Sequence, residues 1–354
     1  MDAKKHLTSL DNNYNTINIS TSNESYETEG GSNIDEYSES NELNSENDDI
    51  QILLTDPSAS FVAEFTDGYA FRNMIEYLRA TNSKGNFRFS NDIIYYEQAD
   101  PNLITVNQIE INTCDLSNYE FYSNVPELIV GVNISDMRAI TKTIGKKDSI
   151  RLYKNSNDPI LYIQIISGNT RSGSRTNISI VRPQQVEVIN YNFPEYKRNE
   201  RFPNCTVSST DFAKMCTSMS SLKCNTVTVH GYPKGVVFEG LTEGSMSGRI
   251  EQFGSPDGFT SSQSMDSSIP NRKLNNITIP NGPKPRLIIK NNNPEEQVNI
   301  KIKMSLIKSL AKLNNLSNHG MIKLYMEQDN PLKIMCQIGN YGTLRVYIRS
   351  DDEC

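Results

Sequence analysis

Residues 131–153 read GVNISDMRAITKTIGKKDSIRLY, and this stretch contains the pattern that decides the fold. An apolar run leads into a segment whose apolar residues recur every three to four positions, and an alternating run follows. This change of period predicts a short amphipathic helix between two strands. The helix would turn Ile134, Met137, Ile140 and Ile144 inward, and Arg138 and Lys142 outward.

The same pattern occurs four times along the chain. The helical segments are FRNMIEYLRA from Phe71, ISDMRAITKTIGKK from Ile134, FAKMCTSMSSLK from Phe212 and SLIKSLAKLNNL from Ser305. Each has one apolar face, carries Lys or Arg on its polar face, and is followed by sequence rich in β-forming residues. Glu76 is an acidic residue among the cations of the first segment. Two helix-plus-sheet units in each half indicate an internal repeat.

Short apolar or alternating runs between the helices predict strands. They are FVAEF (61–65), NFRFS (86–90), DIIYY (92–96), LITVNQIEI (103–111), ELIVGVNI (127–134), SIRLY (149–153), ILYIQII (160–166), TNISIV (176–181), QVEVI (185–189), TVTVH (226–230), GVVFE (235–239), GRIEQF (248–253), MIKLYM (321–326), PLKIMCQI (331–338) and TLRVYIRS (343–350). The predicted class is α+β, with two similar domains that each pack two helices on antiparallel sheets.

Composition divides the chain further. Residues 1–58 are rich in Ser, Asn, Asp and Glu, and so are predicted to be a disordered acidic extension. We expect domain 1 over 59–182, a connector over 183–203 that contains NYNFPEYKRNERFPN, and domain 2 over 204–354. Residues of about 254–297 are rich in Ser, Pro, Gly and Asn, and are predicted to be an insertion in domain 2.

The charge is spread unevenly. Residues 1–60 contain 13 acidic residues against two lysines, whereas the remaining residues contain 29 acidic and 33 basic residues. The main part of the chain is therefore mildly basic behind an acidic extension. Basic helix faces on such a chain favour association with a polyanion such as nucleic acid, through charge and shape.

The sequence shows no arrangement of residues that is typical of a catalytic site. The three histidines, His6, His230 and His319, are far apart, and no Walker motif or GxGxxG stands after a strand. The six cysteines show no zinc spacing and no disulfide framework, which favours thiols in a reducing, intracellular compartment. We therefore expect no enzyme, no metal and no cofactor. No signal peptide or membrane span is predicted either, so we expect no membrane partner.

Three stretches resemble one family. GVNISDMRAITKTIGKKDSIRLY (131–153), NFPEYKRNERFPNCTVSSTDFAKMC (192–216) and NPLKIMCQIGNYGTLRVYI (330–348) are similar, in order and spacing, to segments of the eukaryotic-type DNA polymerase sliding clamp, proliferating cell nuclear antigen (PCNA). The resemblance extends from about Phe61 to Arg349. It implies the DNA-clamp fold and a homotrimeric ring around double-stranded DNA, with helices lining the hole. Such a ring would bind DNA without sequence preference.

The resemblance also implies three sets of site residues and their partners. The DNA-binding set is Arg72, Arg79, Arg138, Lys142, Lys214, Lys308 and Lys312. The partner-peptide set, for DNA polymerase and other clamp-binding proteins of replication and repair, is Ala99, Leu103, Tyr191, Phe193, Pro194, Pro331, Tyr347 and Ile348. The subunit-interface set is Ile178, Ile180, Met219, Leu222, Gly248 and Ile250. A clamp loader would open the ring.

The chain departs from the family in three places. Where family members usually have a Tyr-Leu-Ala-Pro-like segment, this chain has Tyr347-Ile348-Arg349-Ser350, so the Ala-Pro part is absent. Phe193 replaces an aliphatic residue of the connector, and the extension and insertion have no counterpart in the family. With the Asn- and Lys-rich composition, these departures suggest a large DNA virus, with replication in a nucleus or a cytoplasmic viral factory. Two alternatives stay open: a monomeric processivity factor that binds DNA without a ring, and a repair or checkpoint scaffold with the clamp fold.

Overall fold

The computed structural model describes residues 59–168, 176–193, 196, 200–222, 224–242, 248–254, 298–317 and 320–350. The elements of the first half are β1 (Ala59–Phe65), α2 (Gly68–Thr81), β2 (Lys84–Phe89), β3 (Ile93–Ala99), β4 (Thr105–Asn112), the 3₁₀ turn η1 (Thr113–Asp115), β5 (Asn118–Phe121), β6 (Leu128–Asn133), α3 (Ile134–Thr141), β7 (Ser149–Asn155), β8 (Leu161–Ile166) and β9 (Thr176–Val181).

The second half follows the same order of helices and strands, except that β5 has no counterpart among its described residues. Its elements are β10 (Cys205–Ser208), α4 (Ser209–Ser220), β11 (Thr226–Tyr232), β12 (Gly235–Leu241), β13 (Gly248–Gly254), β14 (Val298–Lys303), α5 (Met304–Leu310), the 3₁₀ segment η4 (Ala311–Asn315), β15 (Met321–Tyr325), β16 (Leu332–Ile338) and β17 (Gly342–Ile348). The two halves thus share one plan, as the sequence predicts.

Local sequence explains where the helices begin. Asp67, Asn133 and Ser208 precede α2, α3 and α4, and each side chain accepts a hydrogen bond from a backbone N–H of the first turn. Such caps satisfy N–H groups that have no partner inside the helix. The apolar face of each helix is buried against the sheets, with Phe71, Met74 and Leu78 on α2 as an example. Polar faces with the basic residues remain outside.

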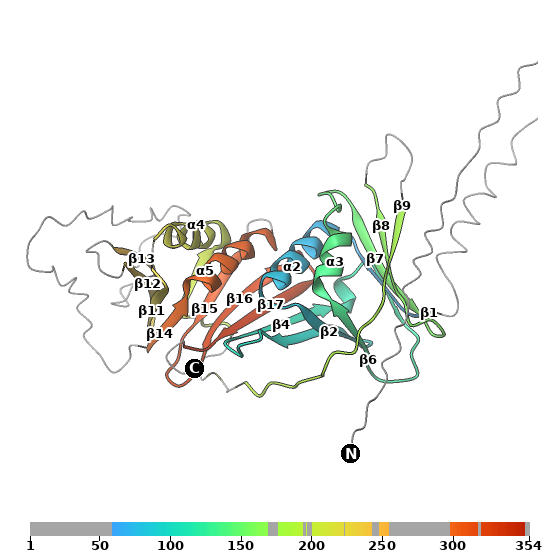
Figure 1. The fold of residues 1–354 in the computed structure, drawn as a ribbon, viewed down its shortest axis with the longest axis horizontal. Helices are drawn as coiled ribbons and strands as arrows, with labels where there is room; N and C mark the ends of the chain where they lie inside the picture. The colour runs from blue at the N-terminus through green and yellow to red at the C-terminus, as the bar shows by residue number, and fades with distance from the viewer. Residues whose placement is uncertain are drawn as a thin grey trace, which may run out of the picture. The chain divides into compact units, whose positions relative to one another are not determined.

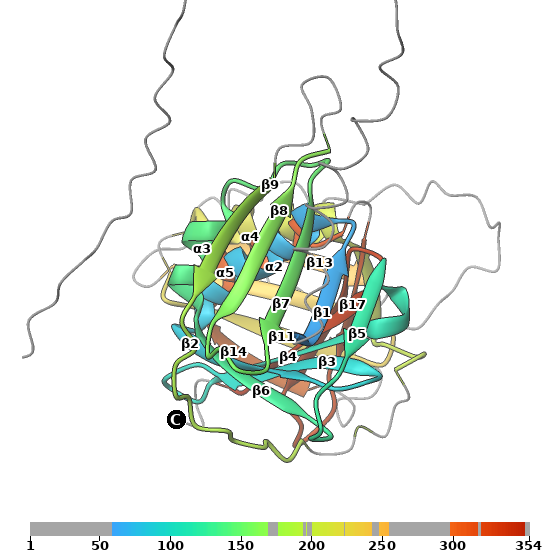
Figure 2. The same cartoon turned by 90° about the vertical axis from the view of Figure 1, so that its right-hand side faces the viewer.

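The strands form three sheets, and every pairing among the described residues is antiparallel. The five-stranded sheet has the order β5-β1-β7-β8-β9, which Figure 2 shows side by side. The four-stranded sheet has the order β13-β12-β11-β14. The third sheet has eight strands in the order β10-β15-β16-β17-β4-β3-β2-β6, and so contains strands of both halves.

The two halves are joined through strands β4 and β17. Their register pairs Gly342 with Ile111 and Ile348 with Thr105, so one continuous sheet crosses the seam. The four helices lie in a row on one side of this sheet (Figure 1). Their buried faces and the inner faces of the sheets form a continuous apolar core. The seam is therefore a packed and hydrogen-bonded part of the protein.

Several details differ from the sequence-based predictions. Helix α3 ends at Thr141, and the fourth helical segment changes from α to 3₁₀ at Ala311. QVEVI (185–189) is not a strand, although it alternates, because it belongs to the connector and lies outside the three sheets. Strands β5, β10 and β14 were not predicted. The predicted extension (1–58) and nearly all of the predicted insertion lie outside the described residues.

The five described cysteines are free thiols, of which Cys114 is exposed and the others are buried. Burial raises the pKa of the Cys216 and Cys336 thiols to about 12. These groups are therefore protonated at neutral pH and pack as small apolar side chains.

Candidate nucleic-acid interface and partner surface

The seven cations predicted to bind DNA lie on the four helical segments or at their ends. Arg72 and Arg79 belong to α2, Arg138 to α3, Lys214 to α4 and Lys308 to α5. Lys142 follows the last residue of α3, and Lys312 lies on η4. Because the helices form one row beside the eight-stranded sheet (Figure 1), all seven residues belong to segments on the helical side of the molecule.

These cations differ in what they contact. Arg79, Lys142 and Lys308 are exposed and have no ion-pair partner among the described residues. Arg72 donates a hydrogen bond to the carbonyl oxygen of Ile144 (2.8 Å) and lies over the ring of Tyr69. The first three are therefore the most available to an external anion.

The other three cations are paired with acidic side chains. Lys214 lies 3.2 Å from a carboxylate oxygen of Asp211, one turn earlier on α4. Glu76 of α2 contacts two cations at once: its Oε2 accepts from Nε of Arg138, and its Oε1 lies 3.3 Å from Nζ of Lys312. The helical side is thus basic overall, but its charge is partly neutralised at defined places.

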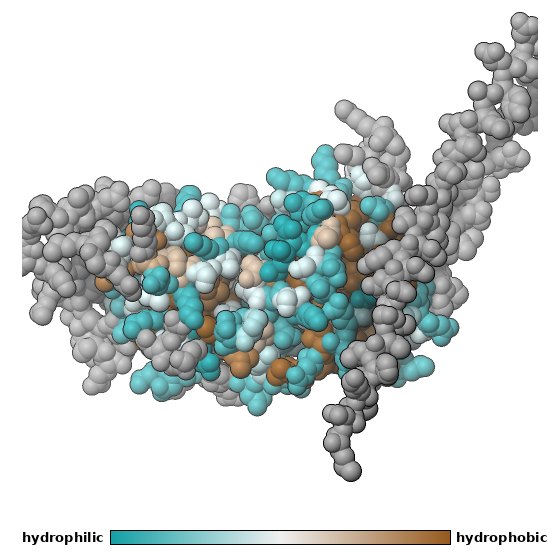
Figure 3. All heavy atoms as spheres, viewed as in Figure 1, coloured by the Kyte–Doolittle hydropathy of each residue, from teal (hydrophilic) through white to brown (hydrophobic). Residues whose placement is uncertain are grey.

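Four of the six predicted subunit-interface residues lie on strands that end their sheets among the described residues. Ile178 and Ile180 belong to β9, the last strand of the five-stranded sheet, and both side chains are about half exposed (52% and 53%). Gly248 and Ile250 belong to β13, the last strand of the four-stranded sheet. Figure 3 shows apolar surface over the part of the molecule where Figure 1 places β8 and β9.

Met219 and Leu222 support β13 rather than extend its exposed edge. Met219 is fully buried and Leu222 is half buried, and both lie close to Gly240 of β12. A side chain at position 240 would overlap Leu222 Cδ1, which explains glycine there. Arg249 and Glu251 of β13 contact Ser218 of α4. The prediction that Met219 is a surface contact is therefore corrected, since the core has already buried this side chain.

The connector crosses the face of the eight-stranded sheet that is opposite to the helices (Figure 1). Three contacts attach the connector to strands β2, β3 and β17. Asn190 accepts from Arg88 on β2 (3.0 Å), the backbone N–H of Tyr191 donates to Glu97 on β3 (2.8 Å), and the ring of Phe193 stacks on Tyr347 of β17 at 3.9 Å between centroids. These contacts fix the position of a segment that has no regular structure of its own.

The partner-peptide set is only partly an open surface. Tyr347 is buried beneath Phe193, and the carbonyl oxygen of Pro331 accepts from the Tyr196 hydroxyl (2.6 Å). Ile348 lies on the other face of β17 and is fully buried in the core, which corrects its prediction as a pocket residue. Alternation along a strand places neighbours on opposite faces, so Tyr347 and Ile348 cannot share one surface. Pro194 lies outside the described residues.

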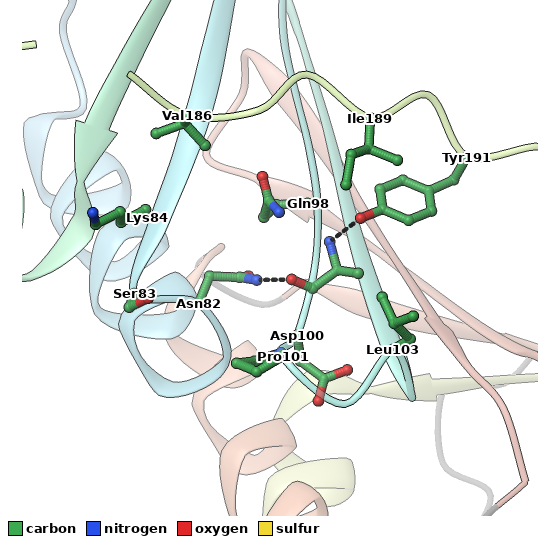
Figure 4. A pocket seen from close by; sticks show the side chains of 11 residues that line it. Asn82, Ser83, Lys84, Gln98, Asp100, Pro101, Leu103, Val186, Ile189 and Tyr191 are labelled. Atoms are coloured by element: carbon green, nitrogen blue, oxygen red, sulfur yellow. Dashed lines mark hydrogen bonds between the residues drawn. The ribbon is translucent and has the colours of Figure 1, made fainter. Parts of the chain in front are cut away.

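An open cavity of about 240 Å³ lies between the connector and the β3–β4 turn (Figure 4). Tyr191 closes one side of it, because its hydroxyl accepts from the N–H of Ala99 (3.3 Å). Leu103 is 57% exposed at the rim, in the left-handed backbone region. The lining residues are Asn82, Ser83, Lys84, Gln98, Ala99, Asp100, Pro101, Leu103, Val186, Ile189 and Tyr191.

A charged network that the sequence did not reveal attaches the connector to the second half. Nζ of Lys333 on β16 lies 2.6 Å from Oε1 of Glu200 and faces the rings of Tyr196, Tyr325 and Tyr347. Arg345 of β17 contacts both Glu200 (2.9 Å) and Glu110 of β4 (2.6 Å). The alternating charges of the connector were a signal that it carries ion pairs, but they did not identify the partners.

Within the described ranges, no helix is long and apolar enough to cross a membrane. No group of three or more His, Cys, Asp or Glu side chains in those ranges is arranged to bind a metal ion.

Solved structures with this fold are known. The chain is similar to the proliferating cellular nuclear antigen of Entamoeba histolytica, with a TM-score of 0.60 and 17% identity over 82% of this chain and 98% of that one. It is also similar to a structure of the PCNA2–PCNA3 complex of Sulfolobus tokodaii, with a TM-score of 0.60 and 14% identity over 82% of this chain and 99% of that one. No family model and no curated protein sequence matches it. The chain therefore has the PCNA clamp fold, as predicted.

Proposed function

We propose that this chain, which has the PCNA clamp fold, is the subunit of a homotrimeric sliding clamp that encircles duplex DNA at sites of replication. It would hold DNA polymerase and other clamp-binding proteins on the template, after a clamp loader has opened the ring. It would perform no catalysis. The observation that carries the proposal is that β9 and β13, the end strands of two sheets, are equivalent by the internal repeat to β17 and β4, which pair with each other at the seam inside the chain.

The internal repeat relates strands of the two halves. Ile150, Leu152 and Tyr153 of β7 correspond to Ile322, Leu324 and Tyr325 of β15. When the strand registers are followed outward from this match, β9 corresponds to β17, with Ser179 equivalent to Val346. A second match sets Asn133, at the end of β6 before α3, equivalent to Lys303, at the end of β14 before α5. Following the registers from it, β13 corresponds to β4, with Arg249 equivalent to Asn107.

This correspondence makes the free edges complementary. Strands β17 and β4 pair with each other inside the chain, with Arg345 opposite Gln108. Their equivalents β9 and β13 are end strands of their sheets. If a second copy repeats the inner seam, β9 of one subunit pairs with β13 of the next, and Ile178 lies opposite Ile250. Such a head-to-tail contact is heterologous, and it closes into a ring when the rotation between subunits is a simple fraction of a turn.

The helical side would then face the DNA. Its cations contact phosphates, which are the same for every sequence, so binding would be independent of sequence and would weaken with salt. The connector side would face outward, and short peptides of partner proteins would bind at the cavity between Ile189, Tyr191 and Leu103.

A disulfide test examines the proposed register. In a Cys114→Ser, Cys354→Ser background, Ile178→Cys with Ile250→Cys is expected to give three subunits joined in a covalent cycle under mild oxidation. Directly opposite residues of an antiparallel pair have Cα atoms about 4.5–5.5 Å apart, which suits a disulfide. Non-reducing electrophoresis and native mass measure the product.

Two controls accompany the disulfide test. Ile178→Cys alone has no partner thiol, and Ile178→Cys with Gln252→Cys moves the second thiol to a diagonal position about 7–8 Å away. Equal cross-linking by the diagonal pair would contradict the proposed register. A monomer at all protein concentrations would contradict the proposed ring and favour the ring-free processivity factor.

A charge reversal tests the DNA-facing side. Lys142→Glu with Lys308→Glu is expected to weaken binding to a short linear duplex by at least about tenfold, and to lower the salt slope by about one for each lost phosphate contact. Fluorescence anisotropy over a salt series measures both. Lys84→Glu, at the rim of the connector cavity, is the matched control for each of the two reversals made singly. A similar loss with Lys84→Glu would mean that only net charge matters, and that the helices have no special role.

A further inference from the structure

The internal repeat also relates the helices, and so compares their charged residues directly. Phe71, Met74 and Leu78 of α2 occupy the positions of Phe212, Met215 and Met219 of α4, at the same distance from the capping residues Asp67 and Ser208. In the second pair of helices, Ile134 and Met137 of α3 correspond to Met304 and Ile307 of α5. It follows that Arg138 is equivalent to Lys308, and Lys142 to Lys312.

The two halves differ at one position of this charged face. Glu76 on α2 is equivalent to Thr217 on α4. Glu76 binds Arg138 and Lys312. Thr217 instead donates its hydroxyl proton to the carbonyl oxygen of Ala213 (2.8 Å), and Lys308 and Lys142, the equivalents of those two cations, have no ion-pair partner among the described residues.

We infer that Glu76 is a resident anion, which occupies Arg138 and Lys312 in place of a DNA phosphate and so weakens the hold of the clamp on DNA. This inference rests on the proposed function, since it assumes that the helical side faces the duplex. Glu76 is a positioning residue in this account: it acts through the two cations and does not itself contact DNA.

The exposure of this group fits competition with an external anion. The side chains of Glu76, Arg138 and Lys312 are each between 36% and 39% exposed, so solvent and ions reach them. Burial opposes the charged form of Glu76, but hydrogen bonds from Arg138 and Lys312 outweigh it and hold the pKa of the carboxyl below its ordinary value. The carboxylate is therefore charged at neutral pH, and it competes with a phosphate for both cations.

The location of Glu76 confines this neutralisation of cations to the seam between the two halves of one chain. Lys312 comes from the second half of the chain, and Asn73 of α2 donates to the carbonyl oxygen of Asn315 (2.7 Å) at the same junction. The seam between the halves thus carries neutralised cations. By the repeat, the seam between two subunits would bring Thr217 toward Lys142 of the next copy, with no acid between them. The proposed ring would alternate weak and strong phosphate contacts.

The test is duplex binding by the full chain with Glu76→Gln and with Thr217→Glu. A short linear duplex is the probe, because a ring can thread onto its ends without a loader, and anisotropy is followed over a salt series. Glu76→Gln is expected to bind about fivefold more tightly and with a steeper salt slope, since it frees two cations. Thr217→Glu is expected to bind about fivefold more weakly, because it places a carboxylate beside Lys308.

Asp136→Asn is the matched control for net charge. Asp136 is exposed and lies about 160° around α3 from Arg138, away from the ion pair. Tighter binding by Glu76→Gln but not by Asp136→Asn, with weaker binding by Thr217→Glu, supports the inference. Unchanged or weaker binding by Glu76→Gln, or an equal gain with Asp136→Asn, overturns it while the proposed function stands. Absence of salt-dependent binding by both the wild-type chain and Glu76→Gln overturns the proposed function itself.

Discussion

Replacing Glu200 by glutamine is expected to destabilise the folded chain by about 2–3 kcal/mol and to release the connector from the sheet. The reason is Lys333, whose side chain is 7% exposed and whose ammonium lies 2.6 Å from Glu200. Without that carboxylate a charged amine stays buried among three aromatic rings. Arg345 is affected less, because it keeps Glu110 as a partner. Urea unfolding followed by circular dichroism measures the loss.

The same residue makes stability depend on acid. Burial opposes the charge of Glu200, but the hydrogen bonds from Arg345 and Lys333 outweigh it and lower the pKa of the carboxyl from 4.5 to about 2. A group whose pKa is depressed in the folded state stabilises it fully above the unfolded pKa, and this contribution is lost as the pH falls through the folded pKa. Wild type should therefore lose the Glu200 contribution between about pH 4.5 and 2. Glu200→Gln should lack this part of the acid dependence.

Two further variants separate the ion pair from other effects. Glu187→Gln makes the same chemical change on the connector, at an exposed side chain that has no ion pair among the described residues. It is expected to leave the free energy of unfolding unchanged. Lys333→Met added to Glu200→Gln should restore much of the loss, because a buried apolar side chain needs no counter-charge. Destabilisation by Glu187→Gln equal to that of Glu200→Gln would show that Lys333 is not the cause.

Replacing Ile178 by aspartate is expected to dissociate the proposed ring into monomers that remain folded. Ile178 is 52% exposed in the single chain, so aspartate costs little there. In the ring it would lie opposite Ile250, where burial of an unpaired carboxylate costs several kcal/mol at every interface. Light scattering should report a mass near 39.9 kDa in place of three times that value.

Ile129→Asp is the matched control for this experiment. Ile129 is 44% exposed on β6, which belongs to the eight-stranded sheet and not to either sheet that supplies β9 or β13, so the trimer should persist. Thermal unfolding of both variants checks that the fold is kept. A trimer that survives Ile178→Asp would remove β9 from the interface, and retention on circular DNA would then have to depend on another surface.

The elements with strong periodicity were predictable from the sequence. In α2 the apolar residues Phe71, Met74 and Leu78 repeat at helical spacing and are buried, and Asp67 caps the first turn. Strands such as β7 and β15 alternate clearly in SIRLY and MIKLY. Such patterns reflect only which side of an element faces the core, which is why they can be read locally.

Weak or conflicting local patterns were misread. QVEVI alternates like a strand but joins none of the three sheets, and the side-chain amide of Asn86 on β2 donates to the carbonyl oxygens of its Val186 and Glu187. Strand β5 has four residues, all half buried, and so has no contrast between its faces. Met219 and Ile348 were placed on surfaces by analogy of position, whereas both are buried in the apolar core.

The repeat of two halves, the type of most elements and the basic faces of the helices could be predicted from the sequence, because these depend on spacing along one segment. Which cations have acidic partners became visible only in the folded chain. Glu76 meets Lys312 across 236 positions, and Glu200 meets Lys333 across 133. Contacts of that kind depend on how distant elements are brought together by the shared eight-stranded sheet, and no local pattern records them.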